Sequence, residues 1–302
     1  MGGIATPELA RTVADAGGLG MVALHSFPAE EVASILDRLA ATTTGAVGIN
    51  FLMPFMDEAA LEAAASRCRL VELFYGDPVA GLVERIHHGG ALACWQVGSA
   101  DEARAAADAG CDLIVAQGTE AGGHVRGGMS LLPLLGEVLD RVGVPVLAAG
   151  GIATGRSVAA VLAAGAAGAR VGTRFVASSE SVGHPDYIAA LLDADGADTV
   201  LTEAFGDGWP HAPHRVLRSC IEAATGLDRD VAATVATDAG PRPVPRFSPE
   251  APHLDMTGRI DATALYAGQG VGAVTAVQPA ADILGELCEA AAEILHASGP
   301  PT

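Results

Sequence analysis

An alternation that repeats from residue 7 to about residue 176 constrains the fold most strongly. A short aliphatic run is followed by a glycine or polar turn and then by a stretch rich in Ala, Leu, Glu and Arg, which is the pattern of alternating strands and helices. The runs are almost continuously hydrophobic, as strands buried on both faces of a parallel sheet are. We expect strands at Leu19–Leu24, Ala46–Phe51, Leu70–Phe74, Ala91–Gln96, Asp112–Gln117, Val144–Ala149 and Ala169–Val171.

Segments of helical composition separate these runs, and two of them carry capping patterns. Thr6 precedes a proline at the first helical position, and Ser99 precedes an acidic residue at the third; both patterns start helices. The expected helices are Pro7–Ala16, Ala29–Ala40, Glu58–Ser66, Val79–His88, Ala100–Ala109, Leu131–Arg141 and Arg156–Ala164. The predicted fold class is therefore α/β, a (β/α)8 TIM barrel of which seven strands are visible.

The alternation stops after Phe175. Residues 185–193 and 211–225 have helical composition, whereas 226–262 is rich in Pro, Asp and Arg and predicts an extended excursion over the surface. Because no separate core of strands is evident, we expect a single domain over residues 1–302. In it, 176–262 forms a substrate-side elaboration and 263–296 a C-terminal helical return, interrupted by the turn YAGQGVG.

All 17 basic residues are arginines, so the chain contains no lysine. This excludes a phosphate-binding P-loop lysine, a Schiff base and a lysine general base. The 36 acidic residues give a formal net charge of -19, which repels a phosphate backbone and an anionic membrane surface. We therefore expect neither nucleic acid nor a membrane as a partner.

The N-terminal sequence and the cysteines predict a cytoplasmic protein without a metal site. No basic stretch is followed by an apolar core at the N-terminus, and no run approaches 18 apolar residues. The five cysteines are scattered without CxxC spacing, which is typical of small buried hydrophobic residues in a reducing compartment. A homodimer is one assembly that the sequence leaves open.

Two glycine-rich turns, at 148–154 and 171–173, follow successive strands. A phosphate held by backbone N–H groups needs residues without a Cβ, and helix N-termini supply positive potential without a basic side chain. This pair of loops is the usual phosphate site of a barrel enzyme. We interpret Gly150, Gly151, Gly172 and Thr173 as phosphate-binding residues; the alternative is that the glycines only make tight turns.

Neutral amides end two other strands. Asn50 and Gln96 can donate and accept hydrogen bonds together, which is what the edge of a heterocycle such as a flavin ring requires. Each amide alone is weak evidence, because a strand-end amide can equally satisfy a loop carbonyl.

The most informative segment is QGTEAGGHVRG, residues 117–127. Its glycines let the backbone fold closely over a planar ligand, with the imidazole of His124 aimed into the site. A histidine titrates near neutral pH and can exchange a proton with a carbon acid or hold a developing anion. We therefore predict that His124 is catalytic, against the alternative of a solvated or capping side chain.

The remaining motifs are less specific. The segment Trp209–Arg215 either lines a substrate pocket or pins the excursion to the barrel. The histidines that lack an informative context, and that we expect at the surface, are His87, His88, His211, His214 and His253.

Together these motifs resemble those of the nitronate monooxygenases, formerly called 2-nitropropane dioxygenases. The matching segments are GINF at 48–51, QGTEAGGH at 117–124, AAGGIATG at 148–155, RVGTRF at 170–175 and YAGQGVG at 266–272. The resemblance runs across essentially the whole chain. EAGGH in register with the two glycine loops is specific to this group, whereas each piece alone is weak.

The resemblance implies an FMN-containing barrel that oxidises alkyl nitronates with O2 to a carbonyl compound and nitrite. His124 matches the family's catalytic histidine, which would hold the nitro oxygens or remove the α-proton of a neutral nitroalkane. The cofactor contacts that it implies are Asn50, Gln96, Gln117 and Gly122 at the flavin, Gly150, Gly151, Gly172 and Thr173 at the phosphate, and Gln269 in the AGQ turn near the cofactor.

One departure concerns the first strand. Members of the family begin with a strand that ends in a motif like APMGG, and this chain begins at Met1-Gly-Gly, where that strand should end. We expect the first barrel strand to be missing, with a start site assigned too late as the simplest explanation. Two unpaired sheet edges would then lower stability and FMN affinity relative to a form extended upstream by roughly 15 residues.

Two other functions remain as alternatives. The same loops resemble the FMN-dependent enoyl-acyl-carrier-protein reductases, although a lysine-free chain of charge -19 does not obviously offer a basic patch to an acidic carrier protein. The second alternative is a flavin-binding barrel that has lost activity together with its first strand.

Overall fold

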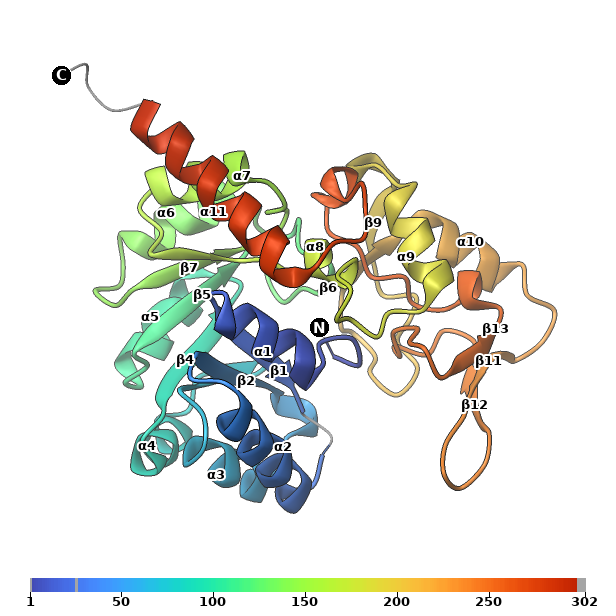
Figure 1. The fold of residues 1–302 in the computed structure, drawn as a ribbon, viewed down its shortest axis with the longest axis horizontal. Coiled ribbons are helices and arrows are strands. Elements are labelled where there is room, and N and C mark those ends of the chain that lie inside the picture. Colours follow the sequence, from blue (N-terminus) through green and yellow to red (C-terminus); the bar gives the residue numbers. More distant parts are fainter. Residues whose placement is uncertain (1, 25–26, 298–302) are drawn as a thin grey trace.

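The computed structural model describes residues 2–24 and 27–297, and its centre is a curved parallel sheet (Figure 1). Seven strands lie in the order β1-β2-β3-β4-β5-β7-β8, and each neighbouring pair is parallel. They are β1 Leu19–Ala23, β2 Ala46–Leu52, β3 Leu70–Phe74, β4 Leu92–Val97, β5 Leu113–Gln117, β7 Val146–Ala149 and β8 Gly168–Arg170. All seven predicted strands are confirmed. Within the described residues, β1 and β8 are the outer strands of the sheet.

Helices cover the outer face of this sheet. They are α1 Pro7–Asp15, α2 Ala29–Thr42, α3 Glu58–Ala65, α4 Ala80–Gly89, α5 Ala100–Asp108, α6 Leu131–Leu139 and α7 Gly155–Ala163, each within two residues of its predicted bounds. Alternation along each strand divides the side chains between two cores. On β3, Val71 and Leu73 belong to the main core under the helices, whereas Leu70 and Phe74 face the inside of the barrel.

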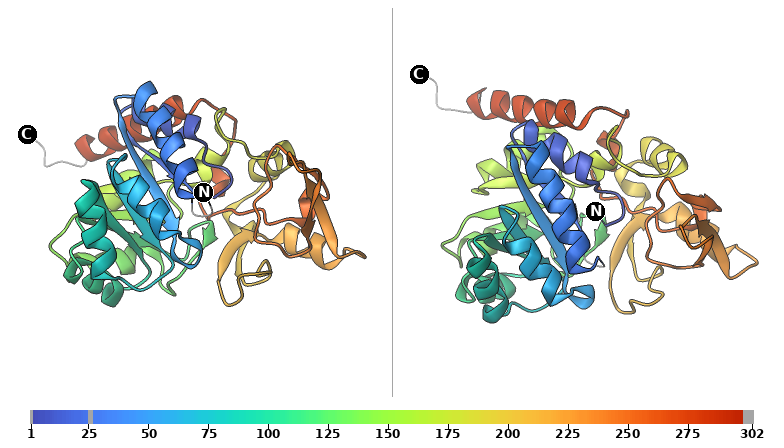
Figure 2. Two further views of the ribbon diagram at one scale, coloured as in Figure 1. Left: turned by 90° about the horizontal axis from the view of Figure 1, so that it is seen from below. Right: turned by 60° about the horizontal axis from the view of Figure 1, so that its bottom comes forward.

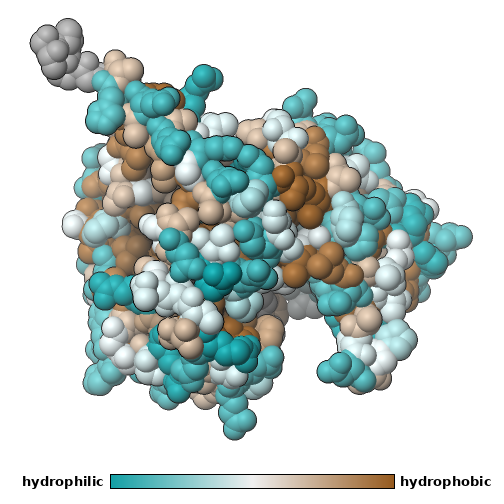
Figure 3. Space-filling model, viewed as in Figure 1, coloured by the Kyte–Doolittle hydropathy of each residue, from teal (hydrophilic) through white to brown (hydrophobic). Residues whose placement is uncertain are grey.

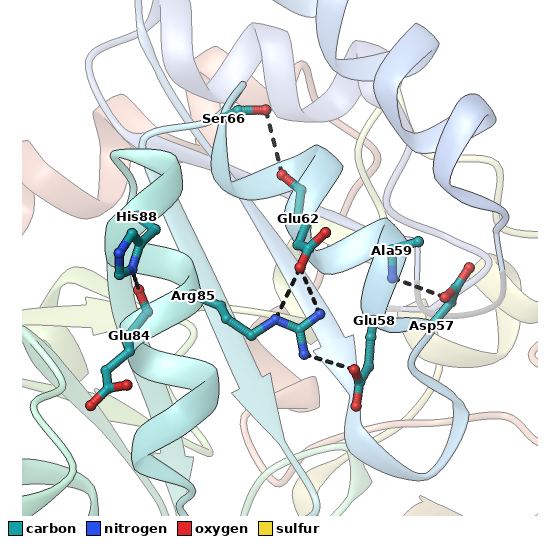
Figure 4. Close-up of polar contacts among 8 residues, drawn as sticks. All are labelled: Asp57, Glu58, Ala59, Glu62, Ser66, Glu84, Arg85 and His88. Carbon is teal, nitrogen blue, oxygen red and sulfur yellow. Dashed lines mark hydrogen bonds and ion pairs between the residues drawn. The ribbon is translucent and has the colours of Figure 1, made fainter.

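Local side-chain contacts fix the helix ends and the spacing between helices. The hydroxyls of Thr6 and Ser99 accept hydrogen bonds from the first turns of α1 and α5, as the capping patterns predict. Figure 4 shows Arg85 of α4 bridging to Glu58 and Glu62 of α3 at 2.7 and 2.8 Å. Because these ion pairs are exposed, they orient the helices more than they stabilise the fold.

The elaboration, residues 176–262, forms a second lobe beside the barrel (Figure 1). Its elements are the end of α8 (Thr173–Val176), α9 Pro185–Leu192, β9 Thr199–Thr202, β10 His214–Leu217, α10 Arg218–Thr225, β11 Val231–Val235, β12 Arg242–Pro245 and β13 Met256–Gly258. They make two antiparallel sheets, β6-β10-β9 and β12-β11-β13, where β6 (Gly123–His124) belongs to the barrel segment. Tyr187, Phe205 and Val216 lie in a hydrophobic cluster of this lobe, distinct from the main core.

Three expectations for this lobe were wrong. The segment 226–262 contains a three-stranded sheet, residues 214–217 are a strand and not a helix, and the lobe has strands around a core of its own. The proline-rich sequence concealed β12, because Pro243 and Pro245 cannot donate to a ladder. They are tolerated since β12 is an edge strand, and its one apolar residue between them, Val244, is buried.

The C-terminal return is helical only in its second half. Residues 263–279 contain no more than the short 3-10 turn Val271–Ala273, and the helix α11 spans Ala280–Ala297. It lies on the outside of the barrel, where it packs against α7 and α1 (Figure 2). Leu9 of α1, Phe175, Ile283 and Leu287 form a small buried cluster at this contact.

Among residues 2–24 and 27–297, no helix combines the length and apolar character that crossing a membrane requires. In the same residues, no three His, Cys, Asp or Glu side chains come together so as to hold a metal ion. All five cysteines are free, and three of them are buried.

Candidate active site

A cavity of about 1260 Å³ opens at the carboxyl ends of the barrel strands and continues into the barrel. The barrel and the elaboration both line it, and the surface is notched between these two lobes (Figure 3). The predicted site residues that line it are Asn50, Gln96, Gln117, Gly122, His124, Gly150, Gly151, Gly172 and Thr173. Positions up to 123 residues apart in the chain therefore face one space.

The predicted phosphate loops form a cradle that has no room for side chains. Gly150 and Gly151 have φ values of 116° and 68°, in the left-handed region that favours glycine. A Cβ at Gly150 would lie 3.0 Å from the carbonyl oxygen of Gly118. The loop enters α7 through Thr154, the N-cap of a capping box. The main chain of these glycines is therefore directly open to the cavity.

The 266–270 turn packs directly against the cradle. A Cβ at Gly122 would lie 2.5 Å from the nitrogen of Gly268, and the Gly268 N–H donates to Thr173 Oγ1 at 3.0 Å. Gln269 is exposed and does not line the cavity; its N–H donates to the carbonyl of Glu120 at 2.9 Å. The structure thus gives Gln269 a backbone contact behind the site and leaves its side chain outside the cavity.

The loop after β5 is held by its own side chains. The carboxylate of Glu120 accepts from the N–H of Leu131 at 2.9 Å and so caps the start of α6. Gln117 Nε2 donates to the carbonyl oxygen of His124 at 3.0 Å. These two contacts fold the glycine-rich loop back over the strand end and place His124 at the cavity.

The imidazole of His124 lies in an aromatic cluster. It stacks on the indole of Trp209, with ring centroids 4.0 Å apart and an interplanar angle of 24°. The rings of His214, Tyr266 and Tyr75 lie at centroid distances of 5.1, 5.8 and 5.9 Å. Burial raises the pKa of Tyr75 to about 12 and also raises the pKa of Tyr266. Both phenols therefore stay protonated and neutral beside the imidazole at neutral pH.

His214 corrects the prediction of a surface histidine, because it is fully buried. Its Nδ1 lies 2.8 Å from the carbonyl of Ala212, and its Nε2 accepts from the N–H of Phe205 at 3.1 Å. Burial lowers the pKa of His214, so the neutral form is favoured. With both ring nitrogens bonded to the backbone, His214 has a structural role. His253 is half-buried and lines the cavity, which also differs from the prediction.

The segment Trp209–Arg215 both lines the cavity and connects the elaboration to the barrel. Trp209 lines the cavity and stacks on His124. Farther along, His214 and Arg215 on β10 pair with His124 and Gly123 on β6. The elaboration is therefore attached to the barrel at the residue that we predict to be catalytic.

Four polar side chains form a cluster inside the barrel, below the cradle. Asn50 Nδ2 donates to Glu72 Oε1 at 2.5 Å, and Arg170 Nη1 donates to Gln96 Oε1 at 2.7 Å and forms an ion pair with Glu72. They come from β2, β3, β4 and β8, and all line the cavity. The two predicted amides therefore bond to an acid and a base on other strands, and not to loop carbonyls.

The residues present fit a flavin mononucleotide. The glycine cradle can take a phosphate on backbone N–H groups, and the amides above can meet a heterocyclic edge. In the described part of the chain, the buried Oε1 of Gln117 has no hydrogen-bond partner, which is costly unless a ligand donates to it. These observations leave room and partners for a phosphate joined to a planar donor-acceptor ring.

Sequence reasoning missed several residues that line the cavity. Glu72 sits in the apolar run LVELF, and a carboxylate inside a buried strand was a usable signal. Arg170 ends its strand as the first residue of RVGTRF, and the sequence pattern assigns this arginine no role. Ser248, Glu250 and His253 come from the excursion, where no periodicity could place them.

The fold and this cavity are those of a TIM barrel with a site at its strand ends, and similarity to known proteins shows the family. The sequence model of one family, described as nitronate monooxygenase, matches residues 1–290. The chain therefore belongs to the nitronate monooxygenase family.

Curated relatives differ in their names. A (3aS,4S,5R,7aS)-5-hydroxy-7a-methyl-1-oxo-octahydro-1H-indene-4-carboxyl-CoA dehydrogenase of Mycobacterium tuberculosis is 36% identical over 223 residues, 72% of this chain and 61% of the relative. A probable nitronate monooxygenase of Staphylococcus aureus is 29% identical over 252 residues, 68% of this chain and 71% of the relative. The chain thus spans less than two thirds of the length of the dehydrogenase.

Solved structures agree with the barrel fold over nearly the whole chain. FabK from Thermotoga maritima has a TM-score of 0.82 at 27% identity and covers 98% of this chain and 92% of its own. A nitroalkane oxidase from Streptomyces ansochromogenes has a TM-score of 0.77 at 29% identity and covers 99% of this chain and 95% of its own. These matches confirm the predicted fold class.

Proposed function

We propose that this protein is an FMN-dependent oxidoreductase that uses O2 to oxidise alkyl nitronates to a carbonyl compound and nitrite. One observation carries the proposal: His124 shares a cavity with a side-chain-free glycine cradle, where an imidazole can act on a substrate stacked over a bound ring. Family membership and the likeness to a nitroalkane oxidase support the same reaction class.

In this proposal the barrel holds the cofactor. Backbone groups at Gly150, Gly151 and Gly172 and the Thr173 segment would bind the phosphate, and Gln117 Oε1 would accept a hydrogen bond from the cofactor. FMN supplies the capacity to accept electrons from a substrate and pass them to oxygen. The protein supplies position, and the absence of lysine is no obstacle because backbone N–H groups bind the phosphate.

His124 is the residue that acts on the substrate. Its cationic form can hold the two oxygens of a nitronate through a charge-assisted hydrogen bond, and its neutral form can take the α-proton of a nitroalkane. Trp209 holds the imidazole plane by stacking. The rings of Tyr75 and Tyr266 lie beside the same imidazole.

A second candidate function is oxidation or reduction of an acyl thioester. The similarity to the carboxyl-CoA dehydrogenase favours it. The charges near the cavity do not favour it, because Arg126 is paired with Glu102 and Asp77, and Arg242 with Glu250. A phosphate-rich thioester would have to displace these carboxylates.

One measurement separates the two functions. Purified protein loaded with FMN is mixed without air with propyl-2-nitronate, with NADH or with an acyl-CoA, and the visible flavin absorbance is followed. Bleaching by the nitronate, then nitrite release and recovery of the yellow colour in air, is the expected result. Bleaching only by NADH or the thioester would overturn the nitronate proposal.

The locations and partners predicted from the sequence stay predictions. A cytoplasmic location, the absence of nucleic acid and membrane partners, and a homodimer as one candidate assembly are consistent with the proposed small-molecule chemistry. Size-exclusion chromatography with light scattering would decide the assembly.

A further inference from the structure

We infer that the buried ion pair between Arg170 and Glu72 sets the electron affinity of the ring in this cavity. Arg170 favours the reduced, more negative ring, and Glu72 opposes it. This inference rests on the proposed function, because it takes the ring to be a flavin. It assigns a role to two residues that the phosphate cradle and His124 leave unexplained.

The pair is anchored so that one partner faces the cavity more than the other. Asn50 fixes Glu72 at 2.5 Å, and only 3% of the Glu72 side chain is exposed. The Arg170 side chain is 25% exposed although it lies deep in the molecule, since it borders the cavity. Both of its hydrogen bonds to Glu72 and Gln96 use Nη1, so the rest of the guanidinium can face a ligand.

Arg170 also supplies a charge that no other arginine provides. Among the described residues that line the cavity it is the single arginine, and the chain has no lysine. Burial works against its charged form, but the adjacent Glu72 outweighs this effect and raises the pKa of Arg170. A fixed cation therefore lies inside the barrel at every accessible pH.

The location of the pair matches where a ring would lie. Arg170 ends β8, two residues before Gly172 of the phosphate cradle. A ring joined to a phosphate held in that cradle would share the cavity that Arg170, Gln96 and Asn50 line. Two-electron reduction adds negative charge to the ring, and a nearby cation in a low-dielectric cavity stabilises that charge.

The test is a charge-neutralisation series on the FMN-loaded protein. The equilibrium constant for two-electron reduction is measured without air against a reference dye, in wild type, Arg170→Gln, Glu72→Gln and the double variant. We expect Arg170→Gln to lower the constant at least tenfold, which is ~30 mV for a two-electron couple. Glu72→Gln should raise it by a similar factor, and the double variant should return close to wild type. Arg170→Lys should restore most of the loss.

The series distinguishes this inference from a structural role and from failure of the proposed function. FMN binding by the wild type is measured first, by fluorescence quenching; no binding would overturn both proposals. Opposite shifts in the two single variants support the inference, since loss of packing would shift both in one direction. FMN binding and nitronate oxidation with unchanged reduction constants in the single variants would overturn the inference alone. If a lone buried charge unfolds one single variant, the other single variant is compared with the double variant, in which two neutral amides face each other, and equal reduction constants in these two would overturn the inference.

Discussion

The barrel and the elaboration contribute different kinds of groups to one cavity. The barrel has parallel strands buried on both faces, and it contributes the glycine cradle, the amides at strand ends, the Glu72–Arg170 pair and His124. The elaboration has two small antiparallel sheets, and it contributes large side chains such as Trp209 and His253. The rigid part thus presents groups suited to a constant cofactor, and the irregular part presents groups suited to a particular substrate.

The backbone conformations show the same division. In the cradle the left-handed residues are glycines, Gly150 and Gly151. Among the described residues, those that have a Cβ and a left-handed conformation are Tyr75, His211 and Phe247, with φ values of 67°, 57° and 67°, which cost free energy. Tyr75 comes from the barrel but faces Trp209 of the elaboration, so the strain lies at the junction.

The largest effect should come from His124, the residue at which the two lobes join. His124→Ala should keep FMN bound, because the cradle is intact, and lower turnover of a nitronate by about 100-fold or more, the range of a lost acid-base group. Nitrite release and FMN absorbance measure the two effects. The control is His211→Ala, whose side chain is 93% exposed. Unchanged turnover would remove His124 from the mechanism.

Gly122→Ala should break the contact between the cradle and the 266–270 turn. Its new Cβ would lie 2.5 Å from a backbone nitrogen that cannot move alone. We expect the FMN dissociation constant to rise about tenfold or more and the melting temperature to fall by several degrees. Gly128→Ala in the same loop meets no atom within 4 Å and should change neither quantity. Equal effects of the two substitutions would contradict this account of the contact between Gly122 and the 266–270 turn.

Trp209→Ala tests whether the elaboration acts on the substrate alone. Loss of the stacked indole should raise the KM for the nitronate roughly tenfold, in line with a lost aromatic contact, and leave FMN affinity unchanged. Trp209→Phe should recover most of the affinity. A variant that loses FMN instead would show that the division between the lobes is false.

The smallest effect concerns pH and the elaboration. The pKa of His214 is lowered in the folded protein, so below its ordinary value of 6.5 the unfolded chain binds the extra proton and stability falls. Between pH 7.5 and 5.5 this should cost about 1 kcal/mol of unfolding free energy. Urea unfolding at both pH values should show that His214→Asn removes this dependence and His211→Asn does not. A pH dependence that survives in His214→Asn would assign it to another group.

The barrel could be predicted from the sequence because its rules are local. Each strand is a continuous apolar run and each helix has an amphipathic pattern. The sequence therefore predicts all seven strands and all seven helices, and the predicted helix ends lie within two residues of the observed ones. The sequence also predicts that the glycine loops and His124 lie close together, because strand order brings the ends of parallel strands to one edge, and they do line one cavity.

The remaining features depend on contacts that no local pattern encodes. The proline-rich β12 is a strand only because β11 offers it an edge, and Gln269 points away because the turn around it packs its backbone on Glu120. Glu72 and Arg170 are 98 residues apart, and each alone contradicts the expectation for a buried strand. Their pairing can be recognised only once β3 and β8 are known to face the same interior.

The last helix has a consequence for how the protein is made. α11 covers α1 and α7, and its residues Ile283 and Leu287 complete a buried cluster with Leu9. While the ribosome is still synthesising the chain, the apolar side of α1 must wait for the emergence of residues some 270 positions later. A contact between residues so far apart in the chain slows folding. It also leaves the apolar surface around Leu9 exposed during translation, when such surface is prone to aggregation.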